Sequence, residues 1–135
     1  MGNSAVAPRM PVTQQVPYCR ATVAFNTVNI GTAGMVPLGT LPDGAIIIGM
    51  LVKITTAFNA ATTNVLTVGT ATSDSAIIAG GDVDETTVGT TVTFAAVGYK
   101  ASGYTPLFIK YAQTGTAATT GAADIILWFV PDNDR

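Results

Sequence analysis

Residues 45–57 read AIIIGMLVKITTA and contain the longest strongly apolar run of the chain. Side chains alternate between the two sides of a β-strand. One side of this run carries Ile46, Ile48, Met50, Val52 and Ile54, and the other carries Ile47, Gly49, Leu51, Lys53 and Thr55. Both sides are apolar at the start and only one at the end, so the strand is expected to run from a covered region toward solvent. Gly49 predicts a β-bulge or a close approach of another segment.

The rest of the chain has the composition of a β protein. Thr, Val and Ile together make up 46 of the 135 residues, whereas Glu occurs once and Leu six times. β-branched side chains fit a pleated sheet and are restricted in a helix. Short apolar runs alternate with clusters of Gly, Thr, Asn and Asp, as in a sandwich or barrel. The predicted strands are 21–29, 45–57, 64–70, 75–79, 91–97, 106–113 and 122–130.

Two connections are interpreted as hairpins. Residues 58–64 would join the strand at 45–57 to the next one, and residues 114–121 would join the last two strands. Symmetry of the second hairpin about residue 117 places Lys110 opposite Asp124. The same register places Leu107, Ile109 and Tyr111 opposite Leu127, Ile125 and Ala123. Opposite charges and aliphatic side chains would then pair across the strands, which stabilises a sheet.

Residues 1–20 differ from the rest and are interpreted as an extended N-terminal arm, followed by one domain over residues 21–135. Three prolines fix the backbone here, and no apolar stretch typical of a secretion signal is present. The arm could be a disordered tail, or it could be ordered against a neighbouring subunit. Its apolar residues and low charge favour contact with a neighbour. The candidate contact residues of the arm are Val6, Arg9, Met10, Val12 and Val16.

A loop supplies two further candidate contact residues, Tyr99 and Tyr104, which flank the sequence KASG. Exposed aromatic side chains can anchor an interface. The alternative is that this pair covers the end of the sandwich.

Charged residues are scarce. The chain has six Lys and Arg and eight Asp and Glu, or 10% of its residues, against about 25% in an average soluble domain. A neutral, hydroxyl-rich surface is one explanation. The other is that partner subunits cover much of the surface, because interface centres are depleted of charge.

Composition also excludes several kinds of chemistry. The chain has no His, so it cannot form a Ser-His-acid triad or a His-ligated metal site, and its single Cys19 cannot form an internal disulfide. The few basic residues are scattered, which argues against nucleic-acid binding, and the apolar runs are too short to span a membrane. We therefore expect no enzyme activity and no cofactor. Asp82, Asp84 and Glu85 form an acidic cluster that could be a cation site or a solvated loop.

The stretch PDGAIIIGMLVKITTAF at 42–58, followed by TNVLTVGT at 63–70, resembles the capsid cement (decoration) proteins of tailed bacteriophages. The resemblance covers a little under a quarter of the chain. It implies an all-β, antiparallel β-sandwich, either a jelly roll or a similar sandwich, which the extended N-terminal arm would precede. It also implies a non-enzymatic structural protein, assembled in the host cytoplasm, that lies on the capsid surface of the virion and bridges subunits of the major capsid protein. The protein would also bind itself as a dimer or trimer, without nucleic acid, membrane or cofactor.

Two other functions are compatible with the same residues. A β-sandwich module of a phage tail fibre or surface appendage would bind glycan or protein. A small subunit of a tail tube or connector would have a similar composition.

Overall fold

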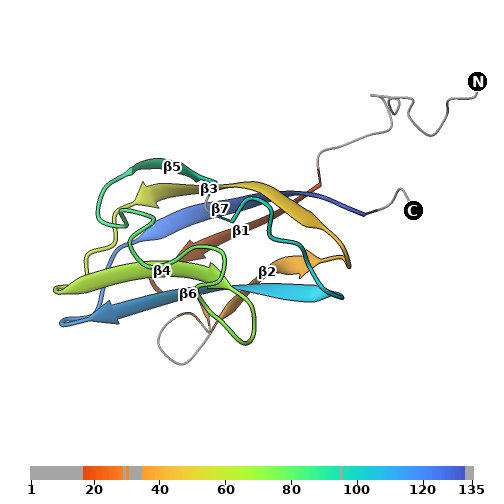
Figure 1. Ribbon diagram of the computed structural model, residues 1–135. Helices are drawn as coiled ribbons and strands as arrows, with labels where there is room; N and C mark the ends of the chain where they lie inside the picture. Colours follow the sequence, from red (N-terminus) through yellow and green to blue (C-terminus); the bar gives the residue numbers. More distant parts are fainter. Residues whose placement is uncertain (1–16, 29, 31–34, 95, 133–135) are drawn as a thin grey trace, which may run out of the picture.

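Figure 1 shows a sandwich of two β-sheets. The computed structural model describes residues 17–28, 30, 35–94 and 96–132. Within these residues the strands are β1 (Tyr18–Ala24), β2 (Val36–Leu41), β3 (Ile46–Thr56), β4 (Thr63–Gly69), β5 (Gly89–Thr93), β6 (Thr105–Thr114) and β7 (Ala122–Val130). All strand pairs are antiparallel. The predicted all-β antiparallel sandwich is therefore confirmed. No helix among these residues has the length and hydropathy that a membrane span needs.

Consecutive strands lie in opposite sheets. The four-stranded sheet has the order β1-β7-β3-β5, and the three-stranded sheet has the order β2-β6-β4. Every connection between consecutive strands therefore crosses from one sheet to the other. The two predicted hairpins at 58–64 and 114–121 are wrong, because each of these segments is an arch between the sheets.

The predicted register of the last two strands is wrong for the same reason. Lys110 on β6 lies opposite Thr67 of β4, and its ammonium group contacts the Asp74 carboxylate at 2.7 Å. Asp124 on β7 lies opposite Thr22 of β1 and Lys53 of β3. A short connection forms a hairpin only when the two strands that it joins lie in the same sheet. Here the two strands lie in different sheets, whose inner faces are buried against each other.

Two strand predictions also fail. The sequence does not predict β2, because Pro37 and Gly39 interrupt its apolar pattern. Both residues lie at a register shift of an edge strand, where proline is tolerated.

The segment 75–79 forms no strand, and its Ile78 makes a single bridge to Val68 of β4. β1 ends at Ala24, short of the predicted limit at residue 29. It begins at Tyr18, so residues 18–20 of the expected arm belong to a strand, and residues 1–16 lie outside the described residues.

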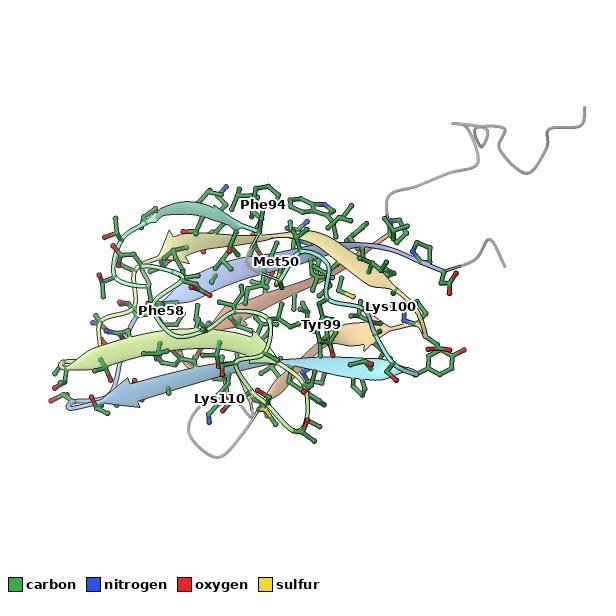
Figure 2. All side chains as sticks on the ribbon, viewed as in Figure 1. Met50, Phe58, Phe94, Tyr99, Lys100 and Lys110 are labelled. Atoms are coloured by element: carbon green, nitrogen blue, oxygen red, sulfur yellow. The ribbon has the colours of Figure 1, made fainter. Side chains whose placement is uncertain are left out.

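The inner faces of the two sheets form one core. Fully buried side chains come from both layers, among them Leu41, Ile47, Met50, Ile54, Leu66, Leu107, Ile109, Tyr111, Ile125 and Leu127. Figure 2 shows Met50 of β3 and Phe58 of the β3–β4 arch between the layers. The pairing of β3 with β7 shifts register between Ile47 and Gly49, which confirms the predicted bulge. The bulge at Ile48 and Gly49 interrupts the alternation of side chains between the two sides of the sheet. Ile47 and Met50 therefore both face the core.

The two arches pack against each other at one end of the sandwich. Phe58 is buried beside the Tyr111 ring, with ring centroids 4.6 Å apart. A Cβ atom at Gly121 would lie 2.2 Å from the Phe58 ring, and the φ angle of +145° at Gly121 also favours glycine. The Asn59 side chain accepts hydrogen bonds from the backbone of Thr119 and Thr120 at 2.8 and 3.0 Å. These contacts connect the sheets at this end.

Glu85 is a buried acid near these arches. Its Oε1 accepts a hydrogen bond from the backbone N–H of Leu66 at 2.7 Å, and its carbonyl accepts one from Phe58 at 2.9 Å. Burial raises the pKa of Glu85, and the hydrogen bond from Leu66 opposes this shift in part. The nearby Glu85 charge adds to burial in raising the pKa of Tyr111.

We expect Glu85→Gln to change the pH dependence of stability. A folded-state pKa above the ordinary glutamate value of 4.5 means that the folded protein binds the proton more tightly than the unfolded chain does. The stabilisation of the fold that comes from this tighter proton binding is complete below pH 4.5 and is lost as pH rises through the folded-state pKa. Gln keeps an acceptor for Leu66 and carries no charge, so Glu85→Gln should match the wild type near pH 4 and exceed its stability at pH 7.

Thermal unfolding of both proteins between pH 4 and 7 measures this difference. As a control, Glu85→Ala should cost about 1–3 kcal/mol at both pH values, since it leaves the buried Leu66 N–H without its acceptor. Parallel stability curves for the wild type and Glu85→Gln would contradict the interpretation.

Candidate interaction surfaces

The outer side of the four-stranded sheet carries a continuous apolar area. Trp128 of β7 lies opposite Tyr18 of β1 and Gly49 of β3. In the next row, Leu51 of β3 lies between Ile126 of β7 and Val92 of β5. We call this area the apolar sheet face, which consists of Tyr18, Ile46, Ile48, Leu51, Val92, Phe94, Ile126, Trp128 and Val130. Tyr18 is 60% exposed and Phe94 is 65% exposed, so large hydrophobic side chains face solvent here.

Gly49 gives the aromatic side chains their position on this face. A Cβ atom at Gly49 would lie 3.3 Å from Cε3 of Trp128 and 3.4 Å from Cε1 of Phe94. Both rings therefore cover the backbone of β3 where it has no side chain. Figure 2 shows Phe94 on the outer side of the four-stranded sheet.

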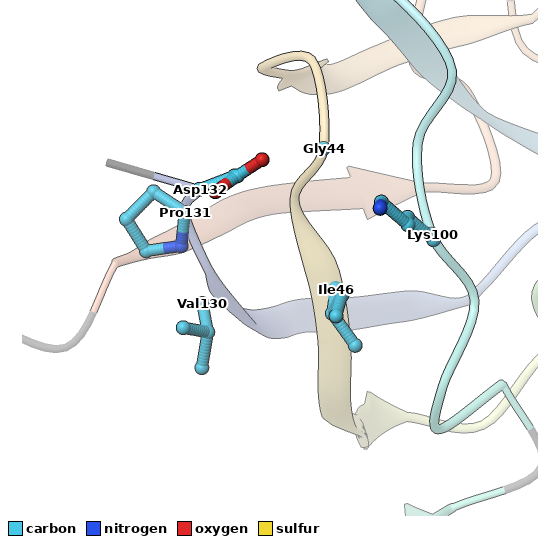
Figure 3. Close-up of a pocket in the computed structure, with 6 residues that line it drawn as sticks. All are labelled: Gly44, Ile46, Lys100, Val130, Pro131 and Asp132. Atoms are coloured by element: carbon cyan, nitrogen blue, oxygen red, sulfur yellow. The ribbon is translucent and has the colours of Figure 1, made fainter. Parts of the chain in front are cut away.

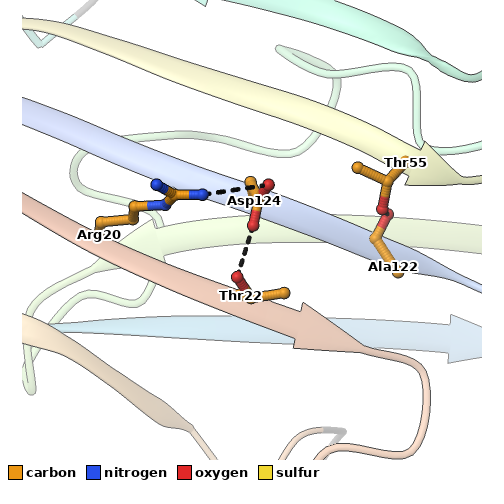
Figure 4. Close-up of polar contacts among 5 residues, drawn as sticks. All are labelled: Arg20, Thr22, Thr55, Ala122 and Asp124. Carbon is orange, nitrogen blue, oxygen red and sulfur yellow. Dashed lines mark hydrogen bonds and ion pairs between the residues drawn. The ribbon is translucent and has the colours of Figure 1, made fainter.

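A polar row limits the apolar sheet face at its other end (Figure 4). The Asp124 carboxylate accepts a hydrogen bond from the Thr22 hydroxyl and lies 3.6 Å from the Arg20 guanidinium. Lys53 lies opposite Asp124 on the neighbouring strand. Thr55 donates a hydrogen bond to the carbonyl of Ala122 at 3.2 Å. The four-stranded sheet is thus apolar at the end where β7 finishes and polar at the end where β7 begins.

The two predicted tyrosines have different environments. Tyr99 is partly buried and packs against the core, and its carbonyl accepts a hydrogen bond from Ile47 at 3.0 Å. This position fits the alternative in which the aromatic pair covers the end of the sandwich. Tyr104 is 81% exposed and directly precedes β6 of the other sheet. The arm residues Val6, Arg9, Met10, Val12 and Val16 lie outside the described residues, so contact with a partner stays a prediction for all seven.

An open pocket lies where β7 ends (Figure 3). It has a volume of about 260 Å³ and is lined by Gly44, Ile46, Lys100, Val130, Pro131 and Asp132. A Cβ atom at Gly44 would lie 2.6 Å from the Asp132 carboxylate, so Asp132 packs directly on the Gly44 backbone. Ile46 and Lys100 form a backbone bridge on the other side. Because Ile46 and Val130 also belong to the apolar sheet face, the pocket continues that face at its edge.

The acidic cluster is used for local backbone contacts. Asp82 accepts a hydrogen bond from the backbone of Ala79 at 2.9 Å, and Asp84 accepts two from Thr86. Hydrogen bonds from Thr86 and Thr87 lower the pKa of Asp84. Glu85 points inward to Leu66. Among the residues that the structure describes, no three His, Cys, Asp or Glu residues are placed to hold a metal ion.

Cys19 packs where the edge strands β1 and β2 approach each other. A Cβ atom at Gly39 of β2 would lie 2.7 Å from its Sγ atom. Burial raises the pKa of the Cys19 thiol, so the neighbouring Arg20 does not activate it. The side chain acts as a small apolar residue between the sheets.

The apolar sheet face was not predicted, although one signal for it was present. Residues 125–130 read IILWFV, which is apolar at every position. A strand of an antiparallel sandwich usually alternates, so an uninterrupted apolar run predicts that both of its sides are covered. The sequence did not show which strands lie beside β7, because its neighbours β1 and β3 are distant in the chain.

Comparison with known proteins gives similarities of structure. No protein-family model matches the chain, and no curated protein matches it. A chain of the cyanophage Pam1 capsid asymmetric unit is similar with a TM-score of 0.67 and 25% identity, covering 96% of this chain and 97% of that one. A chain of the Ralstonia phage GP4 capsid has a TM-score of 0.58 and 18% identity, covering 93% and 90%. A chain of the acid-stable capsid of Helicobacter pylori bacteriophage KHP30 has a TM-score of 0.60 and 18% identity, covering 88% and 90%.

The two matches at 18% identity show a shared fold. The match at 25% identity extends over nearly the full length of both chains and supports a phage capsid-related protein.

Proposed function

We propose that this protein is a non-enzymatic structural protein of a phage virion that binds the outer face of the capsid lattice and bridges major capsid subunits, as a cement protein does. The observation that carries the proposal is the structural similarity, over 96% of the chain, to a chain of a phage capsid. The apolar sheet face supports it as well, since the main exposed apolar patch of a protein is often a surface that binds other proteins.

A cement protein needs contact area more than it needs a cleft. Binding to the assembled lattice stabilises the lattice by mass action, by about 2.7 kcal/mol per site at a free concentration 100 times the dissociation constant. Many copies on one particle add their contributions. The sparse charge of the chain suits such contacts, because charged residues are costly to bury at the centre of an interface.

We also propose that the subunits associate with one another, as dimers or trimers, and that the sandwich is a jelly roll. A jelly roll has eight strands in two sheets. The described strands alternate between the sheets, and Ile78 forms a bridge to Val68 at the free side of β4. An eighth strand at that position would extend the three-stranded sheet, which supports the jelly-roll interpretation.

We expect capsids that carry the full chain to melt at a higher temperature than capsids that carry the chain without residues 1–16. The deletion ends before Tyr18 and leaves every described strand complete. Loss of the arm removes contact area that each subunit contributes to the particle. Particles of the phage that encodes the protein, stripped of it and supplied again with either version, allow the comparison by calorimetry and co-sedimentation.

The copy number per particle provides the control. A cement protein should be present in numbers commensurate with the whole icosahedral lattice. Copies in multiples of three or six at one vertex would indicate a tail component, and binding of a sugar in a titration would indicate a glycan-binding module. Equal capsid binding and equal melting with and without residues 1–16 would refute a role for the arm.

A further inference from the structure

The apolar sheet face is the main exposed apolar area of the described residues. Ten large hydrophobic side chains are exposed among the described residues. Six of them belong to this face: Tyr18, Ile46, Ile48, Val92, Phe94 and Val130. Leu51, Ile126 and Trp128 fill the space between them and are partly exposed. The largest contiguous apolar patch on a protein surface is often a site where a partner binds.

The size of this face limits what can cover it. Four strands about 4.8 Å apart and about five residues along each strand give an area of roughly 300 Å². A stable protein interface needs about 800 Å² on each partner. Two apolar sheet faces packed flat on each other would therefore fall short. The occupant has to contribute contact area beyond the face itself.

Residues 1–16 have the length and the pattern for this. They join the structure at Pro17, whose carbonyl accepts a hydrogen bond from Phe129 at 3.2 Å, directly beside Trp128 and Tyr18. Sixteen extended residues can reach about 50 Å, which is longer than the face. In an extended chain, residues two apart point to the same side. Beyond Met1, the larger apolar residues of the arm are Val6, Met10, Val12 and Val16, all at even positions, whereas the small Ala5 and Ala7 and the single charged residue, Arg9, are at odd positions.

The prolines favour contact with the face of a sheet over addition to its edge. Pro8 and Pro11 have no N–H group to donate, so this segment cannot form a complete ladder with an edge strand such as β5. Side-chain contact with a flat apolar surface needs no such donors. An extended segment with one apolar side therefore suits the apolar sheet face.

The junction favours the face of a neighbouring molecule. β1 starts at the apolar end of the sheet and runs toward the polar row, so a segment that continued the line of β1 backwards would leave the face of its own subunit. To lie on that face the chain would have to reverse at Val16 and Pro17. Proline fixes its own φ angle and holds the preceding residue extended, which disfavours a reversal at this point.

We propose that residues 1–16 of one subunit lie across the apolar sheet face of a second copy of this chain, with Val6, Met10, Val12 and Val16 against the side chains around Trp128. The inference rests on the proposed self-association and specifies how it is achieved. Arm exchange of this kind would supply the missing contact area and would cover Trp128 in the assembled form.

The test compares two full-length variants. One places charges on the apolar side of the arm, and the other places them on the opposite side. Met10→Asp with Val12→Asp places two charges on the apolar side, and Thr13→Asp with Gln15→Asp places the same charges on the other side. Self-association is measured by sedimentation velocity over a range of concentrations. Trp128 is the only tryptophan of the chain, so acrylamide quenching of its fluorescence reports directly on cover of the face.

We expect the wild type and Thr13→Asp/Gln15→Asp to associate and to protect Trp128. Met10→Asp/Val12→Asp should associate about a hundredfold more weakly and should expose Trp128 to quencher, since two buried contacts are lost. Val92→Asp on the face should have the same effect, whereas Val88→Asp, which alters a still more exposed valine outside the face (62% exposed against 49% for Val92), should behave as the wild type.

Three results would overturn the inference. A monomer whose Trp128 is protected at every dilution would mean that the arm covers its own subunit. Association that persists, with Trp128 protected, after deletion of residues 1–16 would mean that faces pack on each other. A monomer with accessible Trp128 would mean that no copy covers the face. Co-sedimentation of the same variants with capsids is measured separately. If the wild type associates with itself but does not bind capsids, the cement role is refuted and arm exchange is not.

Discussion

Replacement of Gly69 by alanine is expected to lower the free energy of unfolding by about 3 kcal/mol or more. Gly69 ends β4, and a Cβ atom there would lie 2.0 Å from the carbonyl oxygen of Ser73 and 2.4 Å from the carbonyl carbon of Asp74. Both atoms belong to the backbone, so no side-chain rotation relieves the clash. The turn at 70–73, closed by a hydrogen bond from Thr70 to Ser73 at 2.8 Å, would have to move.

A second glycine provides the control for this change. Gly89 begins β5, has no atom within 4 Å of its added Cβ, and does not have a positive φ angle. Gly89→Ala should therefore change stability by less than about 1 kcal/mol. Urea unfolding of both variants measures the difference. Equal effects of the two substitutions would contradict the close backbone contact at Gly69.

Phe58→Ala should cost about 3–5 kcal/mol, the range for loss of a buried phenylalanine. The Phe58 side chain is 2% exposed, stacks at a tilt on Tyr111 and packs on the backbone of Gly121. It therefore connects the β3–β4 arch to the other sheet and to the β6–β7 arch. Removal of the ring leaves a cavity between segments that cannot close without movement of both arches.

Phe94→Ala is the matched control, because Phe94 is 65% exposed on the apolar sheet face. Its effect on unfolding of the isolated subunit should be within about 1 kcal/mol. Thermal unfolding of dilute protein measures both variants. A loss for Phe94→Ala as large as that for Phe58→Ala would mean that the Phe94 ring is part of the folding core of a single subunit.

The sequence predicted those strands whose pattern is complete within one segment. The runs at 45–57, 106–113 and 122–130 correspond to β3, β6 and β7, because uninterrupted β-branched and aromatic residues leave few alternatives. Prediction failed where a proline in an edge strand interrupted the pattern at 36–41, and where Ile77 and Ile78 are buried without forming a strand. It also failed for strand pairing, since a short connection does not reveal whether it turns within a sheet or crosses between two.

The candidate surface was harder to predict than the fold. Local composition predicts the arm and Tyr104 as contact residues. The apolar sheet face, in contrast, joins residues from β1, β3, β5 and β7. Only the pairing of distant strands and the bulge at Gly49 bring these side chains together. The sparse charge of the chain is compatible with a neutral, hydroxyl-rich surface or with one that partner subunits cover, and it does not indicate which part of the molecule a partner would cover.

The central place of β7 in the four-stranded sheet has a consequence for synthesis of the protein. β7 separates β1 from β3, so neither neighbour completes its hydrogen-bonding ladder until residues 122–130 have left the ribosome. Formation of the four-stranded sheet therefore depends on pairing between strands that are distant in the sequence, which slows folding. Nascent chains that stop short of β7 would expose unpaired strands, which favours aggregation of such incomplete chains.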